Sequence, residues 1–173
     1  MRFLSDNTAT ACPEILAAMA AANHGRVPAY GEDEWSGRLD RAFSDFFGTE
    51  VRAFAVSTGT AANALALATL SPPYGAIFAH EEAHIATDEC GAPGFFTGGA
   101  QLVLLPGDHG RLAPERFRTA LAAHPPDLHR VQAAVLSLTQ ATECGTAYHK
   151  KDLTQLAAIA HERGLKVHMD GAR

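Results

Sequence analysis

The sequence has few cysteines, no long apolar run and no cluster of basic residues, and each of these absences argues against a class of protein. It contains 3 cysteines, Cys12, Cys90 and Cys144, which are widely spaced and form no CxxC pair. An odd and scattered set of this kind indicates buried or idle thiols rather than a disulfide framework or a metal site.

Membrane and nucleic-acid partners are also disfavoured. No apolar run approaches the ~18 residues that cross a bilayer, and the opening residues MRFLSDNTATACPE lack the apolar core of a signal peptide. We therefore expect a cytoplasmic protein. Lys and Arg number 14 against 19 Asp and Glu, a net charge of −5 without a basic block. Because phosphate neutralisation needs clustered Lys and Arg, a nucleic-acid-binding surface has no support.

The sequence does contain apolar residues in a repeating pattern. Of its 173 residues, 47% are apolar and 19% charged, which is enough for one sizeable core. From about residue 50, short apolar runs alternate with longer stretches at helical spacing, which is typical of βαβ units. The predicted strands are Ala53–Val56, Ala76–Ala79, Gln101–Leu105, Gln132–Leu138 and Leu165–Met169; the predicted helices are Gly59–Leu70, Pro114–Ala123 and His149–Arg163. Continuous apolar strands favour an α/β fold with a mostly parallel sheet between helices.

The region before this pattern has a different character. We expect residues 1–48 to form N-terminal helices and an extended loop of the same domain, and residues 49–173 to form the α/β part. Pro13–Ala22 is rich in alanine and predicts a short helix, whereas Ser36–Phe47 predicts an amphipathic helix capped by Ser36. Between them, His24–Glu34 is rich in Gly, Pro and acidic residues and predicts a loop.

The first segment that carries chemistry is AFAVSTGTAAN, Ala53–Asn63. An apolar run leads through Ser57, Thr58, Gly59 and Thr60 into a helix. Free backbone N–H groups, a positive dipole end and nearby hydroxyls at such a junction suit a phosphate. A single glycine matches neither a Walker loop nor a Rossmann fingerprint. Plain helix capping by Ser and Thr is the alternative interpretation.

The second segment is HEEAH, His80–His84, which formally matches the zinc-protease pattern HExxH. Two histidines four residues apart bind one zinc ion only when they share a helix. The preceding AIFA favours a strand that ends near His80, so the helical condition is not expected to hold. The competing interpretation places His84 at the carboxyl end of a parallel strand, where α/β sheets bind ligands. An imidazole there can stack on a flat ring or move a proton.

The third segment is LKVHMDGAR, which ends at Arg173. A strand delivers Asp170 to its carboxyl end, where a carboxylate needs a partner. A protonated pyridine nitrogen is one such partner, and Arg173 could hold a carboxylate in two-point fashion. A structural Asp–Arg ion pair is the alternative. Together, the three segments offer partners for the phosphate, the flat ring and the ring nitrogen of pyridoxal 5′-phosphate.

In these segments the sequence resembles the threonine aldolases, a branch of the β-eliminating lyases among the pyridoxal-phosphate enzymes of the aspartate-aminotransferase fold type. The resemblance covers almost the whole chain. It runs through FLSDNT, YGEDE, STGTAAN, EEAHIATDECG, the GG of Gly98 and Gly99, SLTQATECGTAY and LKVHMDGAR. The last of these is the most specific. The resemblance implies the large domain of a PLP-dependent transferase-like fold.

The resemblance also implies how the cofactor phosphate is held. Gly59 and Thr60 would contact it, with Ser57 or Thr58 assisting. The implied reaction is the pyridoxal-phosphate-dependent aldol cleavage of L-threonine or L-allo-threonine to glycine and acetaldehyde. The family further implies a homodimer or a homotetramer with a small β-hydroxy amino acid as substrate.

The remaining implied roles concern the cofactor ring and the substrate. His84 would stack over the ring near the substrate hydroxyl, and Asp170 would pair with the ring nitrogen. Arg173 would lie beside the ring oxygen or the substrate carboxylate. Ser5 and Tyr30 are expected at the substrate end or in a subunit contact.

Two departures from the family pattern limit what the resemblance implies. Many relatives have a histidine in the segment that matches SLTQATECG, where this sequence has Thr142, so Cβ stereochemistry is not inherited from them. The family lysine that bonds the cofactor lies beyond the DGAR motif, and Lys150, Lys151 and Lys166 do not match its context. We therefore expect an amino-terminal part of an aldolase that does not complete catalysis by itself.

Three alternatives stay open at the level of sequence. The chain could belong to another lyase or aminotransferase with the same cofactor and fold. It could be a zinc hydrolase built on HEEAH. It could also be a non-enzymatic folding or assembly unit.

Overall fold

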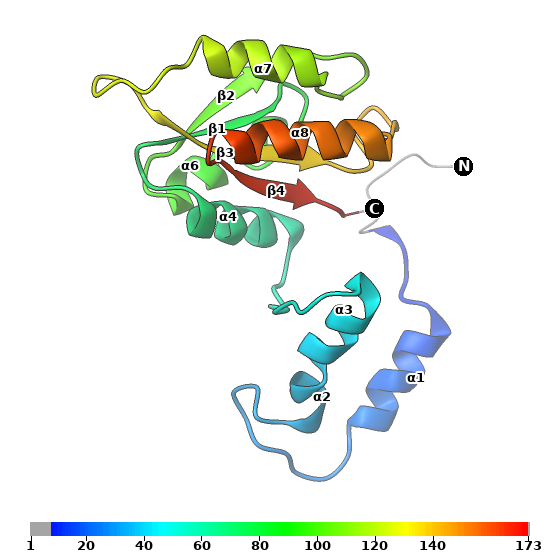
Figure 1. The fold of residues 1–173 in the computed structure, drawn as a ribbon. Coiled ribbons are helices and arrows are strands. Elements are labelled where there is room, and N and C mark those ends of the chain that lie inside the picture. The colour runs from blue at the N-terminus through cyan, green and yellow to red at the C-terminus, as the bar shows by residue number, and fades with distance from the viewer. Residues whose placement is uncertain (1–7, 173) are drawn as a thin grey trace. The chain divides into compact units, whose positions relative to one another are not determined.

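The computed structural model describes residues 8–172, and the chain divides into two compact units between Ala55 and Val56 (Figure 1). The second unit contains a sheet and is described first. None of the helices formed by residues 8–172 combines the length and the apolar character needed to cross a membrane.

The sheet of the second unit has four strands in the order β2-β1-β3-β4, and every neighbouring pair is parallel. The strands are β1 (Gly75–His80), β2 (Gln101–Leu105), β3 (Gln132–Thr139) and β4 (Lys166–Asp170). Each begins and ends within a residue of its predicted range. The predicted α/β class with a parallel sheet is therefore confirmed.

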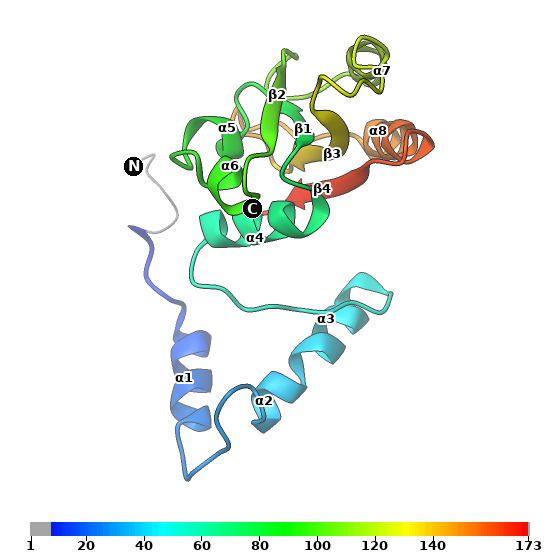
Figure 2. The same cartoon turned by 90° about the vertical axis from the view of Figure 1, so that its left-hand side faces the viewer.

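Helices cover both faces of this sheet (Figure 2). They are α4 (Gly59–Leu70), α5 (His84–Thr87), α6 (Ala92–Phe96), α7 (Pro114–Ala122) and α8 (Lys150–Glu162). The three long helices lie where the sequence predicts them. The sequence does not predict α5 and α6, because helices of 4 and 5 residues are too short to establish a 3.6-residue period.

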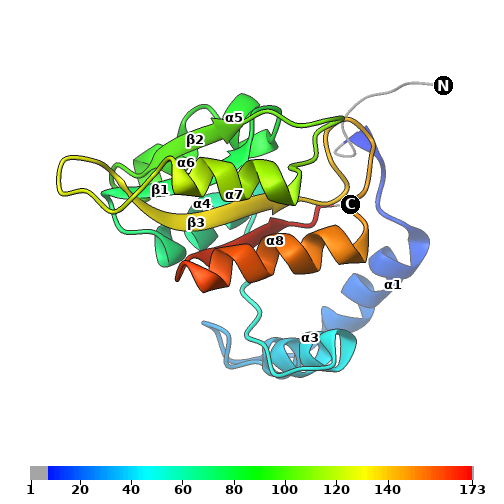
Figure 3. The same ribbon diagram turned by 45° about the horizontal axis from the view of Figure 1, so that its top comes forward.

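The core follows from the alternation of side chains along the central strand. Successive residues of a strand point to opposite faces. On β1, Phe78 packs with Phe117 and other residues of α7 and α8, and its ring centroid lies 5.8 Å from that of Phe117. Ile77 points the other way and packs with Leu67 of α4 and Ile85 of α5. Figure 3 shows α7 and α8 lying along one face of the sheet.

This arrangement brings the chemically interesting segments to one edge of the sheet. Parallel strands end at the same edge, so His80 at the end of β1 and Asp170 at the end of β4 both lie there. Helix α4 leads through a short connection into the start of β1 and runs back along the sheet. Its amino end, at Gly59, therefore also lies at this edge.

The first unit contains α1 (Pro13–Ala22), α2 (Glu34–Gly37) and α3 (Leu39–Phe47). The prediction of one helix capped by Ser36 is wrong. The capping residue is Asp33, whose Oδ1 accepts hydrogen bonds from the backbone N–H groups of Trp35 and Ser36, while the Ser36 hydroxyl donates to Oδ2. Because this carboxylate accepts from the N–H groups of the second and third helical residues, the helix begins at Glu34, and Ser36 lies inside its first turn.

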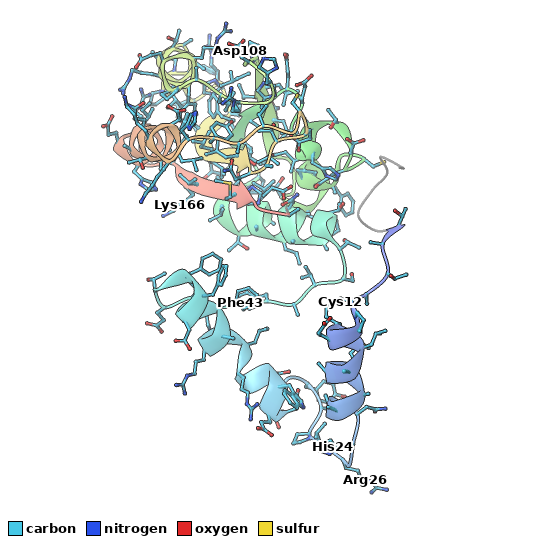
Figure 4. The ribbon with its side chains drawn as sticks, turned by 90° about the vertical axis from the view of Figure 1, so that its right-hand side faces the viewer. Cys12, His24, Arg26, Phe43, Asp108 and Lys166 are labelled. Carbon is cyan, nitrogen blue, oxygen red and sulfur yellow. The ribbon has the colours of Figure 1, made fainter. Side chains whose placement is uncertain are left out.

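The predicted strand Ala53–Val56 is also absent. The backbone N–H of Ala53, which a strand neighbour would have bonded, donates instead to Asp40 on α3 over 2.8 Å. That bond, followed by the Arg52 guanidinium, lowers the pKa of the Asp40 carboxyl. The segment lies along the apolar face of α3, which carries Phe43 (Figure 4), and together they line a groove of about 620 Å³.

The thiols of Cys12, Cys90 and Cys144 are free, and all three residues are exposed. Of the two expectations, buried or idle thiols, burial therefore does not hold, whereas the thiols are unpaired as idle thiols would be. The Cys144 thiol donates to Oε2 of Glu82 over 3.0 Å, and this bond raises the pKa of the thiol. Raising the pKa lowers the fraction of reactive thiolate at neutral pH.

Candidate functional site

Asp170 ends β4, and its carboxylate faces α4. Its Oδ2 accepts a hydrogen bond from Nδ2 of Asn63 over 2.9 Å, and its Oδ1 accepts from the backbone N–H of Ala172 over 3.2 Å. Asn63 is buried in the middle of α4. The side chain of Asp170 is therefore held by a helix more than 100 residues away in the sequence.

A hollow of about 330 Å³ lies between α4 and the end of β4. Gly59, Ala62, Asn63 and Ala66 line it from the helix, and residues 168–172 line it from the strand and the following turn. The amino end of α4 and the carboxylate of Asp170 thus border the same cavity. The small side chains of α4 leave this space open.

Some backbone N–H groups at the amino end of α4 have no hydrogen-bond partner within residues 8–172. Thr58 caps the helix, because its Oγ1 accepts from the backbone N–H of Ala61 over 3.1 Å. Within residues 8–172, the N–H groups of Gly59 and Thr60 and the hydroxyl of Ser57 have no hydrogen-bond partner. A Cβ added at Gly59 would meet no atom within 4 Å. The capping interpretation thus applies to Thr58, and free donors remain beside it for an anion.

His84 begins α5, after a turn that follows β1. Its Nδ1 lies 3.0 Å from Oε1 of Glu89, and its backbone N–H donates to Oε1 of Glu143 over 2.8 Å. The imidazole remains 40% exposed. The ring is therefore held at one nitrogen while the rest of it is reachable from solvent.

Glu89 and Asn63 join His84 to Asp170. Oε1 of Glu89 accepts from Nδ2 of Asn63 over 2.7 Å, and the side chain of Glu89 is completely buried. The resulting chain of contacts runs His84–Glu89–Asn63–Asp170 and crosses from the end of β1 to the end of β4.

Sequence reasoning did not select Asn63 or Glu89, although both lie inside the motifs STGTAAN and EEAHIATDECG. The one available signal for Asn63 was its position four residues after Gly59, which puts both on one helix face. Nothing in a single sequence distinguishes the buried Glu89 from the neighbouring exposed Glu81 and Glu82.

His168 adds a titratable group beneath this edge of the sheet. It lies on β4 and is buried, and its Nδ1 lies 2.9 Å from the hydroxyl of Ser137 on β3. Burial lowers the pKa of His168 from its ordinary value of 6.5, although the nearby carboxylates of Asp170 and Glu89 act in the opposite direction. A neutral imidazole is therefore favoured at this position.

The structure does not support zinc binding by HEEAH, which requires both histidines to lie on one helix. His80 is the last residue of β1 and His84 the first of α5, so the two do not share a helical turn. Both ring nitrogens of His80 are engaged, Nε2 with the carbonyl of Gly107 at 3.1 Å and Nδ1 with the backbone N–H of Glu82 at 3.0 Å. Within residues 8–172, no group of three or more His, Cys, Asp or Glu residues is arranged to hold a metal ion.

The geometry of this hollow does not test three of the predicted site residues. Ser5 and Arg173 lie outside the described residues. Tyr30 belongs to the first unit, where it is fully exposed with φ of +64°. The roles expected for these residues stay predictions.

The position that departs from the family pattern, Thr142, is buried and takes part in a local network. Its hydroxyl donates to the carbonyl of His109 over 3.2 Å and accepts from the backbone N–H of Thr146. It thus stabilises the loop after β3.

The lysines of this chain do not reach the hollow. Lys166 lies at the start of β4 (Figure 4), so four residues at about 3.3 Å each, or about 13 Å, separate its Cα from that of Asp170. Lys150 and Lys151 begin α8, which packs on the face opposite α4. None of the three lines the cavity beside Asp170.

Comparison with known proteins agrees with the resemblance seen in the sequence. The low specificity L-threonine aldolase of Pseudomonas aeruginosa is 45% identical over 172 residues, which cover 99% of this chain and 49% of that protein. The corresponding enzyme of Saccharomyces cerevisiae is 30% identical over 171 residues and 43% of its length. The chain therefore spans about half the length of the curated relatives it matches.

Solved structures show the same relationship. The threonine aldolase of Leishmania major superposes with a TM-score of 0.91 at 29% identity, over 99% of this chain and 49% of that one. A serine palmitoyltransferase from S. paucimobilis superposes with a TM-score of 0.66 at 21% identity, over 91% of this chain and 37% of that one, which shows a common fold. The model of the beta-eliminating lyase family matches residues 2–173, and the chain belongs to this family.

Proposed function

We propose that Gly59, Thr60, His84 and Asp170 hold pyridoxal 5′-phosphate, and that the protein carrying this chain cleaves L-threonine and L-allo-threonine to glycine and acetaldehyde. The observation that carries the proposal is the shared hollow. Free backbone donors at the amino end of α4 and the carboxylate of Asp170 border one cavity. The names of the relatives add support, since those at 45% and 43% identity are low specificity L-threonine aldolases.

The residues present fit the two charged ends of this cofactor. Its phosphate is an anion, and the unpaired N–H groups of Gly59 and Thr60 at a helix amino terminus are donors for an anion. Its pyridine nitrogen is a cation when protonated, and the carboxylate of Asp170 is an acceptor of matching charge. The missing side chain at Gly59 leaves room for the approach of the phosphate.

When bound, the cofactor supplies an electron sink for the pair of electrons released as the Cα–Cβ bond breaks. Asp170 supports this chemistry by keeping the ring nitrogen protonated. Asn63 donates to Oδ2 of Asp170 and so orients the carboxylate. Thr58 keeps the first turn of α4 intact, and with it the geometry of the phosphate donors.

His84 is suited to the proton transfer that the cleavage requires. The β-hydroxyl of the substrate must lose its proton as the aldehyde carbonyl forms, and that proton needs an acceptor. Nδ1 of His84 is bonded to Glu89, whereas Nε2 has no partner within residues 8–172 and belongs to a ring that is 40% exposed. Nε2 is therefore the nitrogen that accepts the proton of the β-hydroxyl. The same nitrogen then returns a proton to the site as glycine forms.

The test uses the product of the intact reading frame that contains this sequence, hereafter the reading-frame product. It is purified without the cofactor and titrated with pyridoxal 5′-phosphate, and acetaldehyde formation from L-threonine and L-allo-threonine is then followed. We expect stoichiometric binding and cleavage of both amino acids. Binding of the cofactor without any cleavage would favour the alternative functions, another lyase or an aminotransferase. Failure to bind the cofactor would contradict the proposal as a whole.

The 173-residue chain by itself serves as the matched control. Lys150, Lys151 and Lys166 do not line the cavity beside Asp170, so no lysine of this chain is in place to bond the cofactor. We expect this chain to release acetaldehyde at a rate no greater than the free cofactor does. Cleavage at the rate of the reading-frame product would show that a lysine of the chain serves after all.

We further propose that the protein assembles as a homodimer or homotetramer. Ile15, Leu16 and Met19 on α1 are each more than half exposed, and burying such side chains favours association. Light scattering on the reading-frame product tests this proposal, and a monomer at micromolar concentration would contradict it. A cytoplasmic location stays a prediction.

A further inference from the structure

Glu89 is the one acid of this edge whose side chain is completely buried, among the residues that the structure describes. Its Oε2 has no hydrogen-bond partner there, and no lysine or arginine forms an ion pair with it. Burying a carboxylate with so little compensation is unfavourable. The contacts of the other oxygen, Oε1, are therefore the only polar contacts of this carboxylate within residues 8–172.

Those contacts fix a direction for each hydrogen bond. Nδ2 of Asn63 can only donate, so Oε1 of Glu89 is the acceptor at 2.7 Å. Oε1 has a second lone pair, and it lies 3.0 Å from Nδ1 of His84. A carboxylate in this position accepts the Nδ1–H of the imidazole. A neutral His84 that is protonated at Nδ1 carries its free lone pair on Nε2.

The same oxygen orients Asn63. The two hydrogens of its amide point to Oε1 of Glu89 and to Oδ2 of Asp170. If the amide were turned over, its oxygen would face two carboxylate oxygens, an arrangement that like charge disfavours. Glu89 therefore stabilises the orientation in which the amide nitrogen of Asn63 faces Asp170.

We propose that Glu89 is a positioning residue that fixes the proton of His84 at Nδ1 and the amide of Asn63 toward Asp170, so that one buried carboxylate prepares both ends of the site. The consequence for catalysis rests on the proposed function, whereas the tautomer of His84 does not. No atom of Glu89 is assigned to contact the substrate.

Other charged groups near His84 do not make the same contact. Glu143 bonds the backbone N–H of His84 and not its ring. The carboxylate of Glu82 accepts from the thiol of Cys144, and that of Asp170 is joined to His84 only through Asn63 and Glu89. The buried ring of His168 bonds Ser137. Glu89 alone among these contacts the imidazole ring of His84.

The direct test is nitrogen-15 NMR of the histidine rings in the cofactor-free reading-frame product, at a pH where His84 is neutral. The signals of His84 are assigned by their loss in His84→Gln. We expect the proton on Nδ1 and an unprotonated Nε2. A wild-type protein with the proton on Nε2 would overturn the proposal without any further variant.

Two substitutions separate positioning from folding. Glu89→Leu has similar volume but no acceptor, and we expect His84 to become a mixture of tautomers. Glu89→Gln retains an oxygen without the charge, and we expect the Nδ1 proton to stay but to resonate upfield, because its hydrogen bond is weaker. Unchanged signals in a folded variant of either kind would overturn the proposal. The Gln variant gives the answer if the Leu variant does not fold.

The matched control is Glu81→Gln, the same chemical change at an exposed glutamate whose side chain forms no hydrogen bond within residues 8–172. It should leave the His84 signals where they are. In cleavage assays with saturating cofactor, Glu89→Leu should lower kcat about 10–100-fold, since the base is no longer oriented. If the wild type neither binds the cofactor nor cleaves threonine, the proposed function fails while the tautomer result still decides the role of Glu89.

Discussion

The side-chain amide of Asn63 donates to Oδ2 of Asp170 over 2.9 Å and joins the middle of α4 to the end of β4. This bond places an acid at the mouth of a cavity whose other wall is the amino end of a helix. A ligand with an anionic and a cationic end needs both walls of this cavity. The backbone N–H groups at the amino end of α4 can bind the anion, and the carboxylate of Asp170 can bind the cation. Each part of this arrangement can be tested separately in the reading-frame product.

The bond between Asn63 and Asp170 should be measurable as a coupling energy. We expect a double-mutant cycle of Asn63→Ala and Asp170→Ala to give about 1.5–3 kcal/mol in the free energy of unfolding, as for a hydrogen bond to a charged group. Urea unfolding of the cofactor-free protein supplies the values. The pair Asn63→Ala and Asp152→Ala should be additive, because Asp152 lies on α8 across the sheet. Additivity of the first pair would mean that the bond is absent in solution.

Asp170→Asn should separate cofactor binding from turnover. The donors at Gly59 and Thr60 remain, so the phosphate is still held, but a neutral amide no longer keeps the ring nitrogen protonated. We expect kcat to fall on the order of 10²–10³-fold, as when one preorganised electrostatic group is removed. The control is Asp108→Asn, an exposed residue outside the cavity. Undiminished cleavage by Asp170→Asn would remove Asp170 from the site.

His84→Asn should slow cleavage while leaving the cofactor bound. The loss of Nε2 as proton acceptor is expected to lower kcat about 10²–10⁴-fold, the usual range for a general base. Cofactor affinity, measured by titration of the same variant, should change much less. His129→Asn, in an exposed loop, provides the comparison. A normal rate in His84→Asn would show that another group accepts the proton.

Thr58→Val should weaken the start of α4. The side chain keeps its shape but loses the oxygen that accepts from the N–H of Ala61, at a cost of about 1 kcal/mol in the free energy of unfolding. Thr58→Ser retains the oxygen and should stay close to the wild type. Thermal or urea unfolding without cofactor checks both variants. Equal stability of the Val and Ser variants would contradict the capping role.

His168 should make the protein less stable in mild acid. Burial lowers its pKa in the folded state below the ordinary value of 6.5. As the pH falls through that value, the unfolded chain takes up a proton that the folded chain resists, so the free energy of unfolding decreases until the pH reaches the lowered pKa. We expect this decrease below about pH 6.5, and His168→Gln should flatten it. An unchanged slope in that variant would assign the pH dependence to other groups.

Local patterns in the sequence were sufficient for most of the second unit. The apolar runs at Ala76–Ala79 and Gln101–Leu105 became β1 and β2, and Gly59–Leu70 became α4 with the predicted bounds. These elements are long enough, or apolar enough, for periodicity and burial to agree. Two predictions failed at places where an aspartate side chain accepts hydrogen bonds from backbone N–H groups. Asp33 caps a helix that begins at Glu34 and includes Ser36, and Asp40 bonds the N–H of Ala53.

By itself, the sequence determined the alternation of strands and helices, the positions of Gly59, His84 and Asp170 at the ends of three elements, and the resemblance to threonine aldolases. The alternation and the element ends depend on residues that are neighbours in the sequence, and the resemblance depends on short motifs. Only the tertiary structure decided that Asn63 and Glu89 connect His84 to Asp170, because those contacts join residues up to 107 positions apart. Contacts of that length depend on how α4 packs against the sheet, and packing is a property of the whole fold.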